Sequence, residues 1–203
     1  MIAIIDYGAG NIKSVINAFK FLGHECVLLS EPGSLKEHSH IVLPGVGAFG
    51  EAMKKLKFNG MDEAIKEAVK SGKAFIGICL GMQLLFEKSF EFGEHEGLSL
   101  LPGEVVKFDE TKFDKPLKIP HVGWNTLSFK QNSPLRLGLK ELEYLYFVHS
   151  YHVVCDDKFA LAKTTYGYEF TSAVQHENLF GFQPHPEKSH EVGLKILENF
   201  ARL

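Results

Sequence analysis

A cysteine between two glycines is the pattern in this chain best suited to chemistry. Cys79 stands in Gly77-Ile78-Cys79-Leu80-Gly81, directly after the apolar stretch 74–78. A reactive residue between a strand and a helix, with a glycine two positions away on each side, is the nucleophile-elbow pattern, here with cysteine in place of serine. The turn is tight, so close backbone approach requires residues without Cβ. The following helix start offers free N–H groups that favour a thiolate and an oxyanion. The alternative interpretation is a buried structural cysteine.

A thiolate nucleophile needs a base and a group that orients the base, and neither has to be close in sequence. The segment Gln183-Pro184-His185-Pro186-Glu187 offers both, just after another apolar stretch. Pro186 stiffens the backbone, so Glu187 can orient one imidazole nitrogen of His185 while the other faces the thiol. Alone, this segment could be a surface turn. Together with Cys79 it predicts a catalytic triad of Cys79, His185 and Glu187.

A glycine-rich loop, Pro44-Gly45-Val46-Gly47, follows the apolar residues 40–43. Its glycines permit unusual backbone angles, and its N–H groups can stabilise a developing oxyanion. A plain strand-to-helix turn is the alternative. Because ligands of parallel sheets bind beyond the carboxyl ends of the strands, we expect Asp6, this loop and Cys79 to share one rim of the sheet.

Short apolar runs and helical patterns alternate in the first half of the chain. Strands are predicted at 2–5, 26–29, 40–43 and 74–78, and helices after Asn11 up to Gly23, at 48–56 and at 61–71. This alternation predicts right-handed βαβ crossovers and a parallel sheet covered on both faces. After about residue 90, Gly and Pro separate short apolar stretches that we interpret as antiparallel strands and hairpins. These stretches are 100–103, 119–124, 144–148, 160–165, 173–175 and 179–183.

A closing amphipathic helix is predicted over Glu191–Leu203. The expected fold class is therefore α/β: a flavodoxin-like three-layer sandwich whose central, mostly parallel sheet has an antiparallel C-terminal extension. No linker, repeat or low-complexity segment interrupts the chain, so we expect residues 1–203 to form a single domain.

The composition is that of an ordinary globular protein, with a formal net charge of −3 over 203 residues. No basic stripe favours nucleic acid or a membrane surface, and no signal-like start or apolar run of ~20 residues is present. Cys26, Cys79 and Cys155 are widely spaced, which favours a reducing cytoplasm over a disulfide scaffold. His149 and His152 complete no four-ligand metal site, and Gly8-Ala9-Gly10 lacks the third glycine of a dinucleotide fingerprint. We expect a cytoplasmic protein without metal or cofactor.

In combination, three of these segments resemble those of class I glutamine amidotransferases. They are Pro44–Gly47, Gly77–Gln83 and His185–Ser189. The resemblance is closer still to the glutaminase subunits of imidazole glycerol phosphate synthases. The likeness covers essentially the whole chain, and it extends to Asp6–Asn11, Gly45–Phe49, Cys79–Phe86 and Gly123–Asn125.

This resemblance implies a role for each catalytic residue. Cys79 would attack the side-chain carbonyl of L-glutamine and form a γ-glutamyl thioester. His185 would donate a proton to departing ammonia and then activate water, and Glu187 would orient His185. The amide of Leu80, with one from the Gly45-Val46 loop, would stabilise the oxyanion.

The resemblance also implies how substrate and partner are bound. Gln83 would help to hold glutamine, together with backbone around Ser150 and Tyr151. The chain would form a heterodimer with a (β/α)8-barrel cyclase subunit, which uses the ammonia to make imidazole glycerol phosphate and AICAR in histidine biosynthesis. The residues at or near that interface and the ammonia path would be Gly10, Asn11, Trp124 and Lys188.

Two positions depart from the family pattern. Pro184 precedes the predicted base where family members usually carry an aromatic residue, and Val122 replaces the common Met before Gly-Trp-Asn. A paralogue that supplies ammonia to a surface-sugar amination synthase therefore remains an alternative. A stand-alone cysteine hydrolase on the same scaffold and a catalytically silent binding subunit are further ones.

Overall fold

Five parallel strands form the centre of the molecule in the computed structural model, which describes residues 1–203. Four of them are β1 (Ile2–Ile5), β2 (Cys26–Leu29), β3 (His40–Gly45) and β4 (Ala74–Cys79). The order in the sheet is β2-β1-β3-β4, followed by β13 (Leu179–Phe182). All four residues of β1 and of β13 are buried, as expected for strands of a parallel sheet covered on both faces. The predicted parallel half is confirmed.

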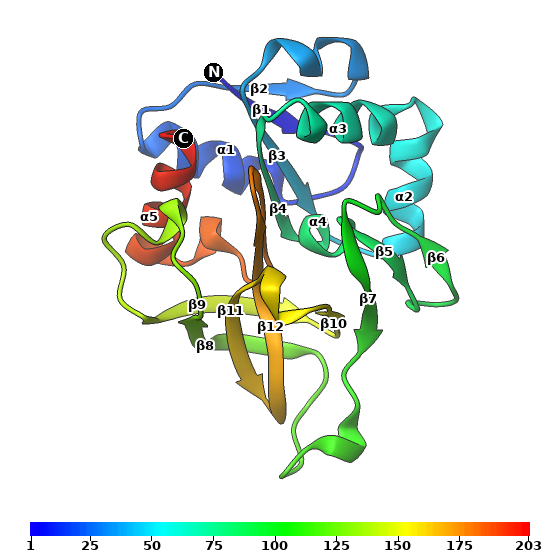
Figure 1. Ribbon diagram of the computed structural model, residues 1–203, viewed down its shortest axis with the longest axis vertical. Coiled ribbons are helices and arrows are strands. Elements are labelled where there is room, and N and C mark those ends of the chain that lie inside the picture. The colour runs from blue at the N-terminus through cyan, green and yellow to red at the C-terminus, as the bar shows by residue number, and fades with distance from the viewer.

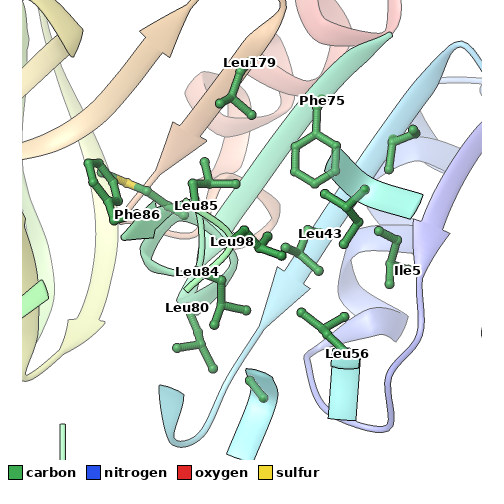
Figure 2. Close-up of a cluster of buried hydrophobic side chains, with 14 of the residues drawn as sticks. Ile5, Leu43, Leu56, Phe75, Leu80, Leu84, Leu85, Phe86, Leu98 and Leu179 are labelled. Carbon is green, nitrogen blue, oxygen red and sulfur yellow. The ribbon is translucent and has the colours of Figure 1, made fainter. Parts of the chain in front are cut away.

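Helices cover both faces of these strands (Figure 1). On one side lie α1 (Ile12–Phe21) and α5 (His190–Ala201), and on the other lie α2 (Phe49–Phe58) and α3 (Met61–Lys70). Each helix pair buries an apolar face in its own hydrophobic core. Figure 2 shows part of the core under α2, where Ile5, Leu43 and Phe75 of neighbouring strands lie near Leu56. The four predicted helices are confirmed, with ends that differ from the prediction by one or two residues; the last begins at His190 rather than Glu191 and ends at Ala201 rather than Leu203.

The second half of the chain extends the sheet with mainly antiparallel strands. The main path continues through β12, β10, β7, β5 and β6, while β11, β8 and β9 branch from β12. Their bounds are β5 Phe86–Ser89, β6 His95–Glu96, β7 Leu101–Lys107, β8 His121–Phe129, β9 Leu142–His149, β10 Tyr151–Val154, β11 Ala160–Tyr166 and β12 Tyr168–His176. The prediction of antiparallel strands after residue 90 is confirmed for most of these stretches. The strand β5 ends before residue 90, is not among the predicted stretches, and pairs in parallel with β7.

The stretch 179–183 differs from the prediction. We expected a strand in an antiparallel extension, but β13 lies between β4 and β12 and runs parallel to β4. A tight connection from β12 turns the chain back, and the side-chain amide of Asn178 donates hydrogen bonds to the carbonyls of Val69 and Lys73. Those bonds fix the start of β13 beside the start of β4, so that the two strands end together at the same rim.

Short helical turns complete the backbone. The α-helical turn α4 spans Leu80–Gln83, and 3-10 turns lie at η1 (Pro32–Glu37), η2 (Glu110–Lys112), η3 (Pro134–Arg136), η4 (Asp157–Phe159) and η5 (Pro186–Lys188). Asn11 precedes α1 as predicted, but its side-chain oxygen accepts from the Ser14 hydroxyl at 2.9 Å and caps no backbone N–H. None of the helices combines the length and apolar character that crossing a bilayer requires.

Two glycines are required where α4 packs against the strands. A Cβ on Gly81 would lie 1.9 Å from the carbonyl oxygen of Leu43 in β3. A Cβ on Gly77 would lie 2.5 Å from the carbonyl oxygen of Gly81. Both contacts are with backbone atoms, which cannot rotate away as the end of a long side chain could. The elbow therefore depends on these two glycines for close packing.

We predict that Gly81→Ala lowers the free energy of unfolding by at least about 1–3 kcal/mol, because the added methyl group overpacks a rigid backbone contact. Urea unfolding followed by circular dichroism measures this. Gly33→Ala is the matched control, since a Cβ at Gly33 meets no atom within 4 Å. Equal unfolding midpoints for the two variants would contradict the packing argument.

Candidate active site

The backbone at Cys79 has the conformation of a nucleophile elbow. Cys79 ends β4 with φ 56° and ψ −112°, and α4 begins at the next residue. A positive φ is uncommon for a residue with a Cβ and costs of order 1–3 kcal/mol. The side chain is 7% exposed and lines a cavity at the carboxyl ends of the strands. The elbow predicted from Gly77 and Gly81 is thus present.

His185 lies three residues beyond the end of β13, the strand that pairs with β4. Its Nδ1 lies 2.8 Å from Oε1 of Glu187, and the side chains of both residues are almost fully buried. The backbone of His185 is fixed on both sides, because its N–H donates to Tyr146 at 2.9 Å and its carbonyl accepts from the Ser189 hydroxyl at 2.6 Å. The buried Pro184 therefore does not prevent the predicted pairing of His185 with Glu187.

The neighbours of His185 favour its protonated form. Burial by itself lowers the pKa of His185, but the sulfur of Cys79 and the carboxylate of Glu187 oppose burial and hold the pKa well above its ordinary value. The Nε2 atom makes no ordinary hydrogen bond in the protein, and Cys79 is the group near enough to influence it. The arrangement therefore suits an imidazolium that can donate a proton from Nε2.

The cavity beside Cys79 has a volume of about 270 Å³. It is lined by Val46, Gly47, Cys79, Leu80, Gln83, Glu91, Val148, His149, Ser150, Tyr151 and His185. Residues predicted as nucleophile, base, oxyanion donors and substrate contacts thus meet in one place. Glu187 lies behind His185, outside the lining. Larger hollows of about 520 Å³ near His40 and about 550 Å³ near Arg136 contain no member of the predicted triad, so we assign the site to the smaller cavity.

Gly45 lies at the edge of this cavity, paired with Cys79 in the parallel register. A Cβ on Gly45 would lie 2.7 Å from the Tyr7 hydroxyl oxygen and 2.8 Å from the Gly81 nitrogen. The loop can thus lie directly against the elbow only because position 45 has no side chain. The Tyr7 hydroxyl is buried without a hydrogen-bond partner, and burial, with Cys79 nearby, raises the pKa of Tyr7. It is therefore a neutral group next to the loop.

The amide of Gln83 is bound by the protein itself. Its Nε2 donates to the Tyr151 carbonyl and to Oε1 of Gln183, each at 3.0 Å. Gln183, which is fully buried, directs its own Nε2 to the Cys79 sulfur at 3.8 Å. The sequence indicates no role for Gln183, because a polar residue at the end of an apolar strand gives no local signal. The predicted Gln83 is in the site, where it fixes the wall that contains Tyr151.

Glu91 is a second residue that the sequence did not indicate. Its Oε2 accepts a hydrogen bond of 2.7 Å from the Phe49 N–H at the start of α2, and the side chain lines the cavity. The two residues are 42 positions apart, so no spacing rule relates them. Glu91 adds a carboxylate that can bind a cationic group of a ligand.

The residues predicted at a partner interface lie on one side of the triad. The indole ring of Trp124 stacks on His190, with ring centroids 5.1 Å apart and planes at 2°. His190 follows Lys188, and η5 contacts α1, which begins after Gly10 and Asn11. On the same face of β8 and β9, five apolar side chains are exposed: Val122, Trp124, Leu142, Tyr144 and Val148. Apart from the His190 ring that stacks on Trp124, these side chains are exposed.

A profile of the family described as glutamine amidotransferase class-I matches residues 3–203. The chain belongs to this family. Among curated relatives, the imidazole glycerol phosphate synthase subunit HisH of Sulfurimonas denitrificans is 60% identical, over 100% of this chain and 98% of the relative. The subunit of the same name from Wolinella succinogenes is 52% identical over the full length of both. Within the class I amidotransferases, the chain therefore belongs with the HisH subunits.

Solved structures support the fold. PurLQS from Thermotoga maritima superposes with a TM-score of 0.77 over 99% of this chain and 97% of the other, at 22% identity. A structure described as a glutamine amidotransferase superposes with a TM-score of 0.75 at 18% identity, over 99% of this chain and 100% of that one. The predicted α/β fold class is confirmed. The names of the relatives do not favour the surface-sugar alternative.

For this class I amidotransferase we predict that Glu187→Gln lowers the turnover of glutamine about 100-fold or more, because the base is no longer oriented and charged correctly. The variant should also lower the pKa of His185. In the wild type, protonated His185 is bound more favourably in the folded than in the unfolded chain. Its contribution to the free energy of unfolding is fully present below pH ~6.5 and is lost as the pH rises through the raised pKa. Glutamate release and imidazole NMR titration measure the two effects.

The control is Glu191→Gln, which removes an exposed carboxylate just beyond the triad segment. This variant should have the wild-type turnover of glutamine and the wild-type pKa of His185. An unchanged pKa of His185 in Glu187→Gln would show that the contact between the two side chains does not control the imidazole.

Proposed function

We propose that this HisH-family chain hydrolyses L-glutamine to glutamate and ammonia through Cys79, His185 and Glu187. The observation that carries the proposal is the cavity of about 270 Å³, where a strained thiol, a carboxylate-bound imidazole and the acidic Glu91 meet. Its size and its polar groups suit one amino acid. The resident side chains are sufficient for the reaction, so no cofactor or metal is required.

Two half-reactions account for the chemistry. The Cys79 thiolate adds to the carbonyl carbon of the glutamine side chain, and the C–N bond breaks as His185 donates its Nε2 proton to the departing ammonia. A γ-glutamyl thioester remains. Water then attacks this carbonyl while His185 accepts its proton, and the C–S bond breaks to release glutamate and restore the thiolate.

The oxyanion of each half-reaction would be bound by backbone N–H groups. The Leu80 amide stands at the start of α4, and Val46 lines the cavity from the opposite side. Fixed donors of this kind are often the largest single contribution to acyl transfer. Gly45 contributes by letting the loop approach the elbow closely enough for Val46 to participate.

The substrate would be held at its amino-acid end. Glu91 offers a carboxylate for the α-ammonium group, which carries the charge that an acidic wall attracts. The backbone at Ser150 and Tyr151 forms the facing wall, and Gln83 fixes that wall through the Tyr151 carbonyl.

The receiver of the ammonia would be a (β/α)8-barrel cyclase subunit, bound as a heterodimer. The names of the curated relatives support this proposal, since those chains are called subunits of imidazole glycerol phosphate synthase. The exposed face of β8 and β9, with Trp124, and the adjacent Asn11 and Lys188 would form the contact. The barrel would then make imidazole glycerol phosphate and AICAR for histidine biosynthesis. We place this single-domain chain, residues 1–203, in the cytoplasm.

We predict that Cys79→Ala abolishes glutamine-dependent synthesis by the two-subunit enzyme, because no thioester can form. Added ammonium salts should still support synthesis, since they bypass the glutaminase. The measurement is AICAR formation from each nitrogen source. Glutamine-dependent turnover that survives in Cys79→Ala would exclude Cys79 as the nucleophile.

We predict that Glu91→Gln raises the KM for glutamine about 10-fold or more with a smaller effect on kcat, because it removes a contact to the substrate rather than to the reacting carbonyl. Steady-state glutaminase kinetics with the barrel subunit present measure this. Glu94→Gln, at an exposed position three residues further on, is the matched control. A wild-type KM in Glu91→Gln would refute the assignment.

A further inference from the structure

Two buried histidines form a continuous hydrogen-bonded path to the wall of the cavity. Asn125 Nδ2 lies 3.2 Å from His121 Nε2, and His121 Nδ1 lies 3.0 Å from His149 Nε2. His149 Nδ1 lies 2.8 Å from the Tyr151 carbonyl oxygen. His121 is 3% exposed and His149 6% exposed. The path thus links the inner side of β8 to the peptide that lines the glutamine cavity.

The donors and acceptors along this path have only one consistent assignment. A carbonyl oxygen can only accept, so His149 Nδ1 carries a proton and, in a neutral ring, Nε2 accepts. His121 Nδ1 must then donate, which leaves His121 Nε2 to accept from the amide of Asn125. The Asn125 amide is oriented independently, because Nδ2 also donates to the Thr165 carbonyl and Oδ1 accepts from the Thr126 N–H.

Both rings are neutral, as this assignment requires. Burial lowers the pKa of His121 to about 4. Burial also lowers the pKa of His149 to about 3, despite its bond to the Tyr151 carbonyl. The His121 ring is held from both sides, stacked on Phe147 at 4.8 Å and on Tyr166 at 4.0 Å between centroids. A ring fixed in this way can transmit a displacement of its strand rather than rotate to absorb it.

The two ends of the path have different roles. At one end, the Tyr151 carbonyl accepts from both His149 and Gln83, so its position is fixed by two donors. At the other end, β8 carries His121 and Asn125 on its inner side. Because side chains alternate along a strand, Val122 and Trp124 project from the outer side and are exposed. A protein bound to that outer side would therefore restrain the strand that begins the path.

We propose that His121 and His149 are positioning residues, which couple the position of strand β8 to the segment at Ser150 and Tyr151 that holds glutamine. The inference rests on the proposed function, because it assumes that the barrel subunit binds the outer face of β8. Neither histidine touches the reacting carbonyl. Their effect is to keep the binding wall at the distance that glutamine requires.

His152 shows what a purely structural histidine in this region does. It is also buried in the same aromatic cluster, but its Nε2 bonds with the Tyr168 hydroxyl at 2.8 Å and its Nδ1 with the Val153 carbonyl at 3.1 Å. It lies outside the path from β8 to the cavity. His152→Phe is therefore the matched control for His121→Phe, since both replace a buried imidazole by a similar ring.

The test is glutaminase kinetics of the two-subunit enzyme, with ammonium-dependent synthesis measured alongside. For His121→Phe we expect a KM for glutamine about 10-fold higher, with kcat changed much less, because the hydrogen bond from His121 to His149, whose ring supports the wall, is lost. His121→Asn, whose amide can still donate where Nδ1 did, should recover part of this loss. His152→Phe should keep the wild-type KM, and all three should keep ammonium-dependent synthesis.

A wild-type KM in His121→Phe would overturn the inference, and so would an equal rise in His152→Phe, which would indicate general loosening of the cluster. If a variant fails to fold, ¹⁵N imidazole NMR of the wild-type complex tests the inference by identifying the protonated nitrogen of His121 and of His149. We expect both rings in the neutral Nδ1–H form at pH 7, and the Nε2–H form in either ring would overturn the inference. Absence of glutaminase activity in the wild-type complex would instead refute the proposed function.

Discussion

Backbone contact without intervening side chains is the constraint on which this site depends. Gly45, Gly77 and Gly81 bring β3, β4 and α4 so close that a single methyl group at any of them would meet another atom at 2.9 Å or less. This closeness lets the chain turn through a positive φ at Cys79 and leave its sulfur in the cavity. It also places the Val46 loop opposite the first N–H groups of α4. The strain at the nucleophile is therefore maintained by packing over three elements rather than by any one bond.

The site lies where the two halves of the sheet meet. The parallel half contributes the proposed nucleophile and the proposed oxyanion donors from strand ends, whereas the antiparallel half contributes the wall at Ser150 and Tyr151. The proposed base, His185, follows β13, the strand that joins the halves by pairing with β4 on one side and β12 on the other. Each half alone would have an incomplete cavity. Catalytic geometry and sheet continuity therefore depend on the same pairing.

Much of this arrangement could be predicted from local sequence. The strands and helices of the first half follow from apolar periodicity, and Cys79 from its flanking glycines and its place between a strand and a helix. Three features could not be predicted locally. The direction of β13 depends on its hairpin with β12 and on Asn178, and the roles of Gln183 and Glu91 depend on contacts across 104 and 42 positions. A polar residue at the end of an apolar strand has the same local pattern whether it faces solvent or a thiol.

The central place of β13 has a consequence for how the protein is made. The strand beside the nucleophile is formed about a hundred residues after β4, so its pairing must close a very long loop, which favours slow folding. Until then β4 has an unpaired apolar edge that is open to pairing with other chains. After β4 is made, a growing chain therefore carries Cys79 for about a hundred residues without His185, the proposed base. The proposed catalytic pair of Cys79 and His185 therefore forms only when the sheet is complete, at the same time as the aggregation-prone edge of β4 is covered.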